Sequence, residues 1–304
     1  SVGARQLVFP QGVPGELGGA PTLALEIAGP ERERRRPVTL GYLAEGLGWS
    51  LDYAATLSAD GERMRLAARA RIRNDTGMDL RDARTELIAG SPHIPADDAQ
   101  PGARARRAEA MAAGVGDAGR PRAAGEYHRL ALASPVTLAA GESASWTLFR
   151  REGIALERVY VLRASMGLRG ARGAAGWQRV PLATTLAWTV GDGPQPGGTI
   201  RFYEPRAGDG GVRLLGGAEI GDRAAGESIE VAVGRPFDVT AERRRSAYER
   251  SDDGESETIT QEIRLRNARE RAVTVRVEET IGGDWVMLES SDDWAKAASN
   301  LAVW

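Results

Sequence analysis

The chain has 304 residues, with 40 basic and 42 acidic side chains and a formal net charge of −2 at pH 7. Hydrophobic residues make up 42 % of it, which argues against a chain that is disordered throughout, and the balanced charge gives no support to nucleic-acid binding through bulk charge. The absence of cysteine excludes disulfides, thiolate metal sites and cysteine nucleophiles.

Apolar and polar residues alternate with a period of two over much of the sequence, a pattern that predicts strands buried on one face. It is clearest over residues 66–72, where apolar side chains alternate with arginines before the turn sequence Asn74-Asp75-Thr76-Gly77. In chain order, further strands are predicted at Thr22–Ile27, Val38–Leu43, Tyr53–Leu57, Arg84–Ala89, His128–Leu132, Ala144–Phe149, Arg158–Arg163, Leu182–Val190, Thr199–Tyr203, Val212–Ile220 and Ser228–Val233.

Two more alternating segments, residues 259–265 and 273–277, follow near the end of the chain. Asn267–Arg271 lies between them and is predicted to be a hairpin connection. Leu265-Arg266-Asn267 also echoes Ile72-Arg73-Asn74. Two similar sandwiches, each with an asparagine that closes a strand, would explain this echo, and so would chance.

The predicted fold is all-β, with two antiparallel, immunoglobulin-like β-sandwich domains in tandem and loops rich in Gly and Pro. Residues 1–37 are predicted to form a β-rich lead-in, residues 38–163 the first sandwich and residues 164–304 the second. The Ala- and Arg-rich segment 99–124 interrupts the alternation and is predicted to be a mobile insertion.

No pattern predicts a catalytic or a metal site. A serine–histidine–carboxylate triad would need His93 or His128, the only histidines, and no G-x-S-x-G sequence is present to offer a serine nucleophile. The acidic clusters lack the spacing of a calcium loop, and the glycine pairs lack the context of a phosphate loop. We therefore expect a protein that is not an enzyme and that carries no cofactor.

A few side chains are candidates for contacts with a ligand or partner. Trp177 and Trp294 lie in polar or Gly-rich surroundings, where an exposed ring face could stack on a sugar. Trp304, at the end of the chain, is a further candidate for a contact with a partner. The basic run Arg34, Arg35 and Arg36 could meet an anionic polysaccharide, lipid headgroups or phosphate, although a solvated loop explains it as well.

One block of the sequence is more specific. Residues 41–53 read Gly-Tyr-Leu-Ala-Glu-Gly-Leu-Gly-Trp-Ser-Leu-Asp-Tyr and lead through Asp60-Gly61 to the turn at Asn74–Gly77. The block resembles the bacterial family called domain of unknown function 4139, related to the mucoidy inhibitor A group. Segments 196–203, 234–239 and 283–285 are similar to later parts of that family, so the resemblance covers roughly residues 20–304. It implies export and β-sandwich domains, and it implies no activity.

We therefore expect an exported protein of the periplasm, the outer membrane or the extracellular space, whose signal segment has been removed before Ser1. No apolar run reaches the roughly eighteen residues of a membrane-spanning helix. The expected role is structural or interactive, through sheet edges and loops. If the chain stops at Trp304, the second sandwich lacks a strand, and an open edge near Asn300–Trp304 would recruit a protein partner or a second copy.

Two other functions stay open. The first is a carbohydrate-binding module that uses exposed Trp and Tyr side chains, with an envelope polysaccharide as ligand. The second is a hydrolase, which would require a pocket with converging carboxylates and a strongly shifted pKa.

Overall fold

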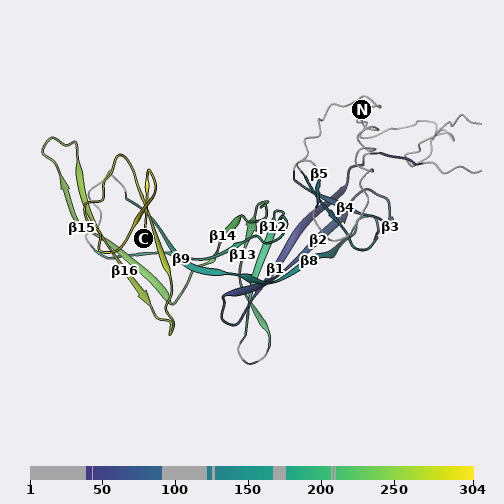
Figure 1. The fold of residues 1–304 in the computed structure, drawn as a ribbon, viewed down its shortest axis with the longest axis horizontal. Coiled ribbons are helices and arrows are strands. Elements are labelled where there is room, and N and C mark those ends of the chain that lie inside the picture. The colour runs from purple at the N-terminus through teal and green to yellow at the C-terminus, as the bar shows by residue number, and fades with distance from the viewer. Residues whose placement is uncertain are drawn as a thin grey trace, which may run out of the picture. The chain divides into compact units, whose positions relative to one another are not determined.

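The structure is a computed structural model that describes residues 39–42, 44–90, 122–124, 127–166, 176–206, 208 and 210–304. These residues form strands and turns and no helix, which confirms the all-β prediction (Figure 1). Among them there is accordingly no apolar helix that could cross a membrane. Residues 45–92 and 117–304 belong to one unit, and residues 1–44 and 93–116 belong to another, of which only 39–42 and 44 are described.

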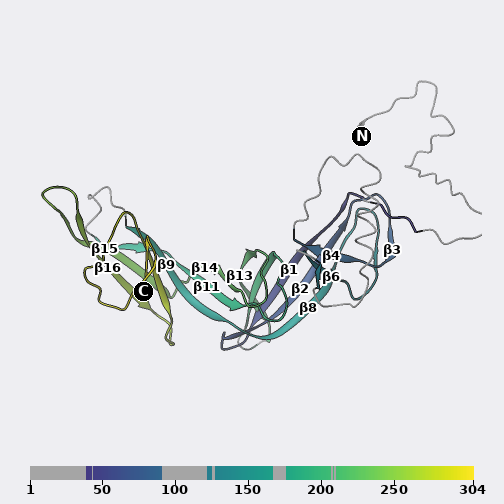
Figure 2. The ribbon, with the colours of Figure 1, turned by 45° about the horizontal axis from the view of Figure 1, so that its top comes forward.

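Two large sheets contain most of the strands. The five-stranded sheet has the order β13-β12-β1-β2-β8, with the bounds Val212–Ile220, Gly198–Pro205, Leu47–Leu57, Arg63–Asn74 and Ser143–Ala155. Figure 2 shows its long strands β1, β2 and β8 side by side. The six-stranded sheet has the order β14-β11-β9-β17-β19-β18, with the bounds Ser228–Gly234, Leu182–Thr189, Glu157–Met166, Val275–Ile281, Leu301–Val303 and Ala295–Ala298.

Three smaller sheets complete the described fold. The first has the order β10-β15-β16, with the bounds Gln178–Val180, Val239–Arg250 and Glu257–Asn267. The second pairs β3 with β7, Leu80–Ala83 with Val136–Leu138. The third has the order β4-β6-β5, with the bounds Glu86–Ala89, Tyr127–Ala131 and Arg122–Ala124. The strand predicted at 22–27 and most of the insertion predicted at 99–124 lie outside the described residues.

The strand pairing corrects two predictions. β1 pairs with β12 and β9 pairs with β17 in parallel, so the prediction of purely antiparallel sheets is wrong. Parallel neighbours need a long connection, and both pairs join strands that are distant in the sequence. The hairpin predicted across Asn267–Arg271 is also wrong, because β16 pairs with β15 whereas β17 pairs with β9 and β19. The tandem immunoglobulin-like arrangement stays a prediction.

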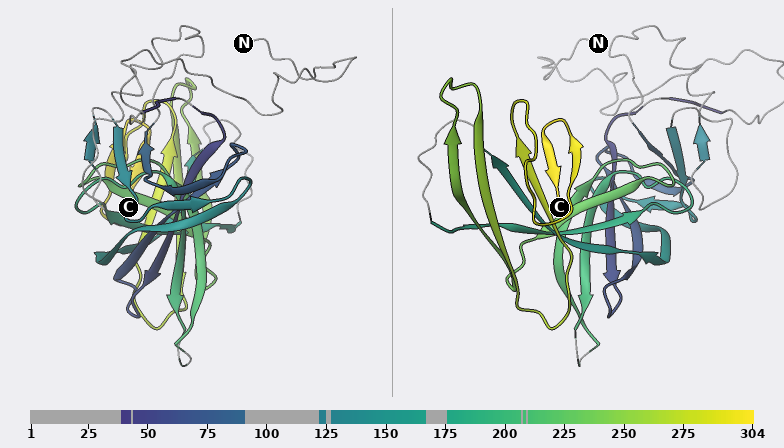
Figure 3. Two further views of the ribbon diagram at one scale, coloured as in Figure 1. Left: turned by 90° about the vertical axis from the view of Figure 1, so that its right-hand side faces the viewer. Right: turned by 60° about the vertical axis from the view of Figure 1, so that its left-hand side comes forward.

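The strand that we expected at an open edge lies inside its sheet. β19 pairs with β17 on one side and with β18 on the other, and this last hairpin is yellow in the right-hand view of Figure 3. The N–H and C=O of Trp304 continue the pairing with Val277 at 3.0 Å each. The prediction of an open edge at Asn300–Trp304 is therefore wrong, because the short strand β18 folds back onto β19 and occupies the edge.

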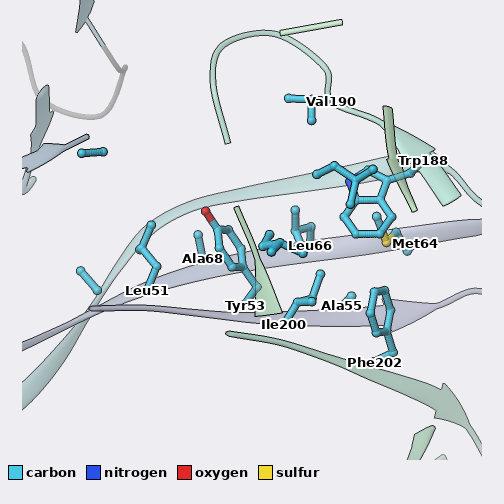
Figure 4. Close-up of a cluster of buried hydrophobic side chains, with 14 of the residues drawn as sticks. Leu51, Tyr53, Ala55, Met64, Leu66, Ala68, Trp188, Val190, Ile200 and Phe202 are labelled. Carbon is cyan, nitrogen blue, oxygen red and sulfur yellow. The ribbon is translucent and has the colours of Figure 1, made fainter. Parts of the chain in front are cut away.

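The main core lies between the inner faces of strands that alternate as the sequence predicts. In β2 every second side chain is buried, from Met64 to Asn74. Trp188 meets Phe202 edge-on in the centre of this core, with 5.8 Å between the ring centroids (Figure 4). The Tyr53 hydroxyl donates a 2.7 Å hydrogen bond to the Pro196 carbonyl, which satisfies the polar atom that this ring buries. A second, smaller cluster consists of Tyr160, Leu162, Leu182, Val239, Ala241 and Val277.

The hairpins β1–β2 and β15–β16 have the same turn. Its sequence is Ser-x-Asp-Gly-Glu at residues 58–62 and again at residues 251–255. Ser58 Oγ donates to Asp60 Oδ1, which also accepts from the Glu62 N–H at 2.9 Å. Ser251, Asp253 and Glu255 form the same bonds, again with 2.9 Å for the backbone donor. Both turns need glycine, since φ is +77° at Gly61 and +72° at Gly254.

The asparagines that close the two hairpins also match. Asn74 Nδ2 donates to the Met78 carbonyl at 2.8 Å, and Asn267 Nδ2 donates to the Arg271 carbonyl at the same distance. Each Oδ1 accepts the N–H two residues later, at 3.1 Å from Thr76 and 3.0 Å from Arg269. The echo between the halves is therefore a repeated hairpin with the same hydrogen bonds at both ends.

This comparison predicts unequal costs for the same substitution in the two copies. Asn74 is fully buried, and its Nδ2 has two further carbonyls, of Leu138 and Ala139, within 3.2 Å. We expect Asn74→Ala to lower the free energy of unfolding by about 3 kcal/mol, because it leaves several buried backbone groups unpaired. The exposed Asn267→Ala should cost about 1 kcal/mol. Urea denaturation measures both, and equal losses would contradict this account.

Candidate functional site

In the sheet β10-β15-β16, no described strand covers the outer side of β16. In the five-stranded sheet, β8 pairs with β2 along almost its whole length. In the second hairpin, β16 corresponds to β2, yet it is the last strand of its sheet, and no described strand pairs with its outer side. Figures 1 and 2 both show the turn end of β15–β16 without a neighbouring strand. The burial of side chains follows this difference, since all of β16 is exposed or only half-buried.

The two edges of this hairpin are not equivalent. β10 covers β15 at Ala241–Arg243, and β15 carries a bulge between Arg245 and Ala247. Bulges twist an edge and disturb further pairing. β16 has no bulge, and its eleven residues form a regular strand. The accessible edge of this sheet is therefore β16.

Trp177 lies against this sheet, and arginines cover its ring. The guanidinium carbons of Arg264 and Arg244 lie 4.0 and 4.7 Å from the ring centroid. Arg244 also donates to Glu262 on the neighbouring strand at 2.8 and 3.0 Å. The predicted contact residue Trp177 is thus half-buried, and the arginines over its ring leave less of that ring to stack on a ligand.

The side chain of Arg243 ties this sheet to the six-stranded one. It donates to Glu279 Oε1 at 2.7 Å and to the Ser165 carbonyl at 3.3 Å. Glu279 is buried, and this burial raises the pKa of its carboxyl although Arg243 opposes the shift. Arg243, Arg244 and Arg245 follow one another in strand β15.

The other two predicted tryptophans lie together in a row. The ring of Trp294 is 5.8 Å from that of Trp285 and 6.4 Å from that of Trp304, measured between centroids. Trp285 donates its indole N–H to the Ser299 carbonyl at 2.8 Å, and Trp304 donates to Ser290 Oγ at 2.9 Å. Trp294 is the most exposed of the three at 37 %, and the exposed side chains Val286 and Leu288 lie in the same segment.

Other candidates of the sequence lie elsewhere. Arg34, Arg35 and Arg36 are outside the described residues, so their prediction is not tested. Trp285, which was not among the candidates, belongs to the tryptophan row, and the Lys296 ammonium lies over its ring at 4.4 Å from the centroid. In the part of the chain that the structure describes, no three Asp, Glu or His side chains gather as a metal site would require.

An arginine-lined cleft was not predicted. It has a volume of about 450 Å³ and is lined by the turn 58–61, by strands β9, β11, β12 and β13, and by the loops around residues 237 and 270. At its wall, Glu204 accepts hydrogen bonds from Arg158 and Arg213, with 3.0 Å to Arg213 Nη2. The side chains of Arg158 and Glu204 are only 14 % and 15 % exposed. Since seven separate segments supply the lining, no local sequence pattern marks this cleft.

The Glu204 carboxyl gives stability a pH dependence of known sign. Its burial alone would raise its pKa, but the hydrogen bonds from Arg158 and Arg213 outweigh burial and hold the pKa below its ordinary value of 4.5. Folded protein then binds this proton more weakly than unfolded chain does. The stabilisation is therefore present above pH 4.5 and is lost as the pH falls through the lowered pKa.

We expect Glu204→Gln to be less stable than the parent at about pH 7, and the difference to shrink as the pH falls to about 3. Free energies of unfolding from urea titrations at several pH values measure this. The exposed Glu219→Gln serves as the control and should leave the pH dependence nearly unchanged. A Glu204→Gln deficit that is the same at every pH would contradict the assignment.

A comparison with protein families gives a match over most of the chain. The family described as a domain of unknown function, DUF4139, matches residues 38–282, a span that contains both copies of the hairpin and every residue of the cleft. A search of the curated proteins finds no match. The family resemblance of the block at residues 41–53 is thereby confirmed, and the chain belongs to the DUF4139 family.

Proposed function

We propose that the chain is a non-enzymatic interaction protein of the cell envelope or the extracellular space, and that it assembles through the edge of β16. The observation that carries this proposal is the uncovered β16, whose counterpart β2 is covered by β8. An uncovered strand offers a row of backbone N–H and C=O groups to another strand. Strand addition uses those groups for affinity and the side chains for specificity.

The charge pattern of β16 favours a second copy of the chain as the added strand. Glu262 and Arg264 lie two residues apart in β16, before and after Ile263, and therefore on the same face of the strand. When two such strands pair antiparallel with Ile263 opposite its own copy, Glu262 of each strand lies opposite Arg264 of the other. The same register sets Arg266 opposite Thr260, so no like charges face each other directly across the pair.

A charge exchange tests this assembly. Glu262→Arg and Arg264→Glu each place like charges opposite one another, and each should raise the dimer dissociation constant about tenfold or more. The double variant restores two opposite-charge pairs and should return the constant to near the parent value. Analytical ultracentrifugation over a concentration series measures all four proteins.

Glu249→Arg is the matched control, because it makes the same charge change at an exposed position of β15. It should leave the dissociation constant unchanged. A parent chain that stays monomeric over the whole series would overturn the proposed assembly, as would two single variants that associate like the parent.

A second candidate function is carbohydrate binding by the tryptophan row. Three indole rings lie together at centroid spacings of 5.8 and 6.4 Å, and the most exposed of them, Trp294, offers a ring face on which a sugar could stack, with Asp292 and Asp293 beside it to bind hydroxyl groups. This candidate depends on Trp294, whereas the edge of β16 does not.

Binding to immobilised glycans tests the tryptophan row. If the row binds sugar, Trp294→Ala should weaken binding at least about tenfold, since it removes the most exposed ring. Trp177→Ala serves as the control and should retain binding, because arginines already cover that ring. No glycan bound by the parent, or equal losses in both variants, would reject the carbohydrate function.

A further inference from the structure

Three buried polar atoms without a partner lie in residues that line the arginine-lined cleft. They are Arg158 Nε, the Tyr160 hydroxyl and Arg269 Nε. A buried donor without a partner is costly, so native proteins supply one, either from the chain or from a bound molecule. Two of these atoms can only donate, and a hydroxyl can also donate. The cleft therefore requires an acceptor.

The charges around the cleft also favour an acceptor that is negatively charged. Five arginines line it, against Asp60, Glu204 and Asp238. Arg158 and Arg213 are both engaged by Glu204, and Arg269 lies 3.7 Å from Asp238, too far for a hydrogen bond. The Asp60 carboxylate is taken up by its own turn, where it accepts from Ser58 and Glu62.

Two further arginines retain donors for a ligand. Arg271 makes one hydrogen bond, from Nη1 to the Asp60 carbonyl at 3.2 Å. Arg235 is exposed at the rim and has no ion pair or hydrogen bond to any residue in the described ranges. Arg269 lies over the Tyr160 ring, with 5.3 Å from its guanidinium carbon to the ring centroid, so a guanidinium and a phenol share one wall.

We infer that this cleft binds an oxyanion, a phosphate or carboxylate group, through Arg235, Arg269, Arg271 and the Tyr160 hydroxyl. An oxyanion accepts several hydrogen bonds at once and neutralises the surplus of guanidinium charge, whereas water would satisfy the donors and leave that charge. Glu204 does not close the site to an anion, because Arg158 and Arg213 already engage its carboxylate. A second cleft, at residues 287–294, has no arginine in its lining.

Calorimetric titration with inorganic phosphate at constant ionic strength tests this inference. The parent should bind phosphate saturably, with about one equivalent per chain. The double variant Arg235→Gln/Arg271→Gln should bind at least about tenfold more weakly, because it removes both guanidinium groups that the chain leaves available. Tyr160→Phe keeps the ring in the second core cluster and should weaken binding as well.

Arg65→Gln is the control, since this arginine is exposed on β2 and does not line the cleft. It should bind phosphate like the parent. A parallel titration with acetate distinguishes the two sources of the anion, because acetate binding that depends on the same residues identifies a carboxylate. Heats that do not saturate with either anion, or binding that survives in both the double variant and Tyr160→Phe, would overturn the inference.

Discussion

Side-chain hydrogen bonds to the backbone hold both ends of the two long hairpins, and the rest of the fold is built around those hairpins. At one end a serine and an aspartate close the turn, and at the other an asparagine bridges five residues of chain. Such local bonds favour the register in which the two strands of each hairpin pair. β12 and β8 pair with the outer edges of the first hairpin, and the main core lies on one face of the resulting sheet.

The second hairpin has the same hydrogen bonds, but the side chains on its faces are different. Core-facing positions of β1 and β2, such as Tyr53 and Leu66, correspond to Arg245 and Ile259 in β15 and β16. The copied face is therefore partly charged, and it buries only Val239 and Ala241 fully. The same backbone frame thus packs a core in one place and presents a charged surface with an uncovered edge in the other.

The sequence predicts elements better than their partners. Alternation marks β2, β12 and β14 because one face of each strand is buried, which is the property that a period of two reports. β15 lacks such a pattern, because three arginines follow one another at residues 243–245. Arg243 pairs with Glu279, whereas Arg244 and Arg245 lie over the rings of Trp177 and Tyr248. Parallel neighbours such as β9 and β17 have no signal in either strand alone.

Sites made from distant segments are harder still to predict. Trp294 could be named from its polar surroundings, but its row with Trp285 and Trp304 depends on how the last hairpin folds back. The cleft is harder still to predict, because Arg158, Glu204 and Arg269 come from three separate parts of the chain. Arginine and glutamate are also frequent throughout this sequence, so none of the three stands out. Only the fold brings their charges together.

The bulge in β15 affects how easily the repeated hairpin is detected in the sequence. From the turn to the closing asparagine, each residue of the second hairpin lies 193 positions after its counterpart, as Ser251 follows Ser58 and Asn267 follows Asn74. Before the bulge the separation is 192, as Val239 follows Leu47. An ungapped self-comparison at a separation of 193 therefore loses the part of β15 that precedes the bulge, and the repeat looks shorter in the sequence than it is in the strand pairing.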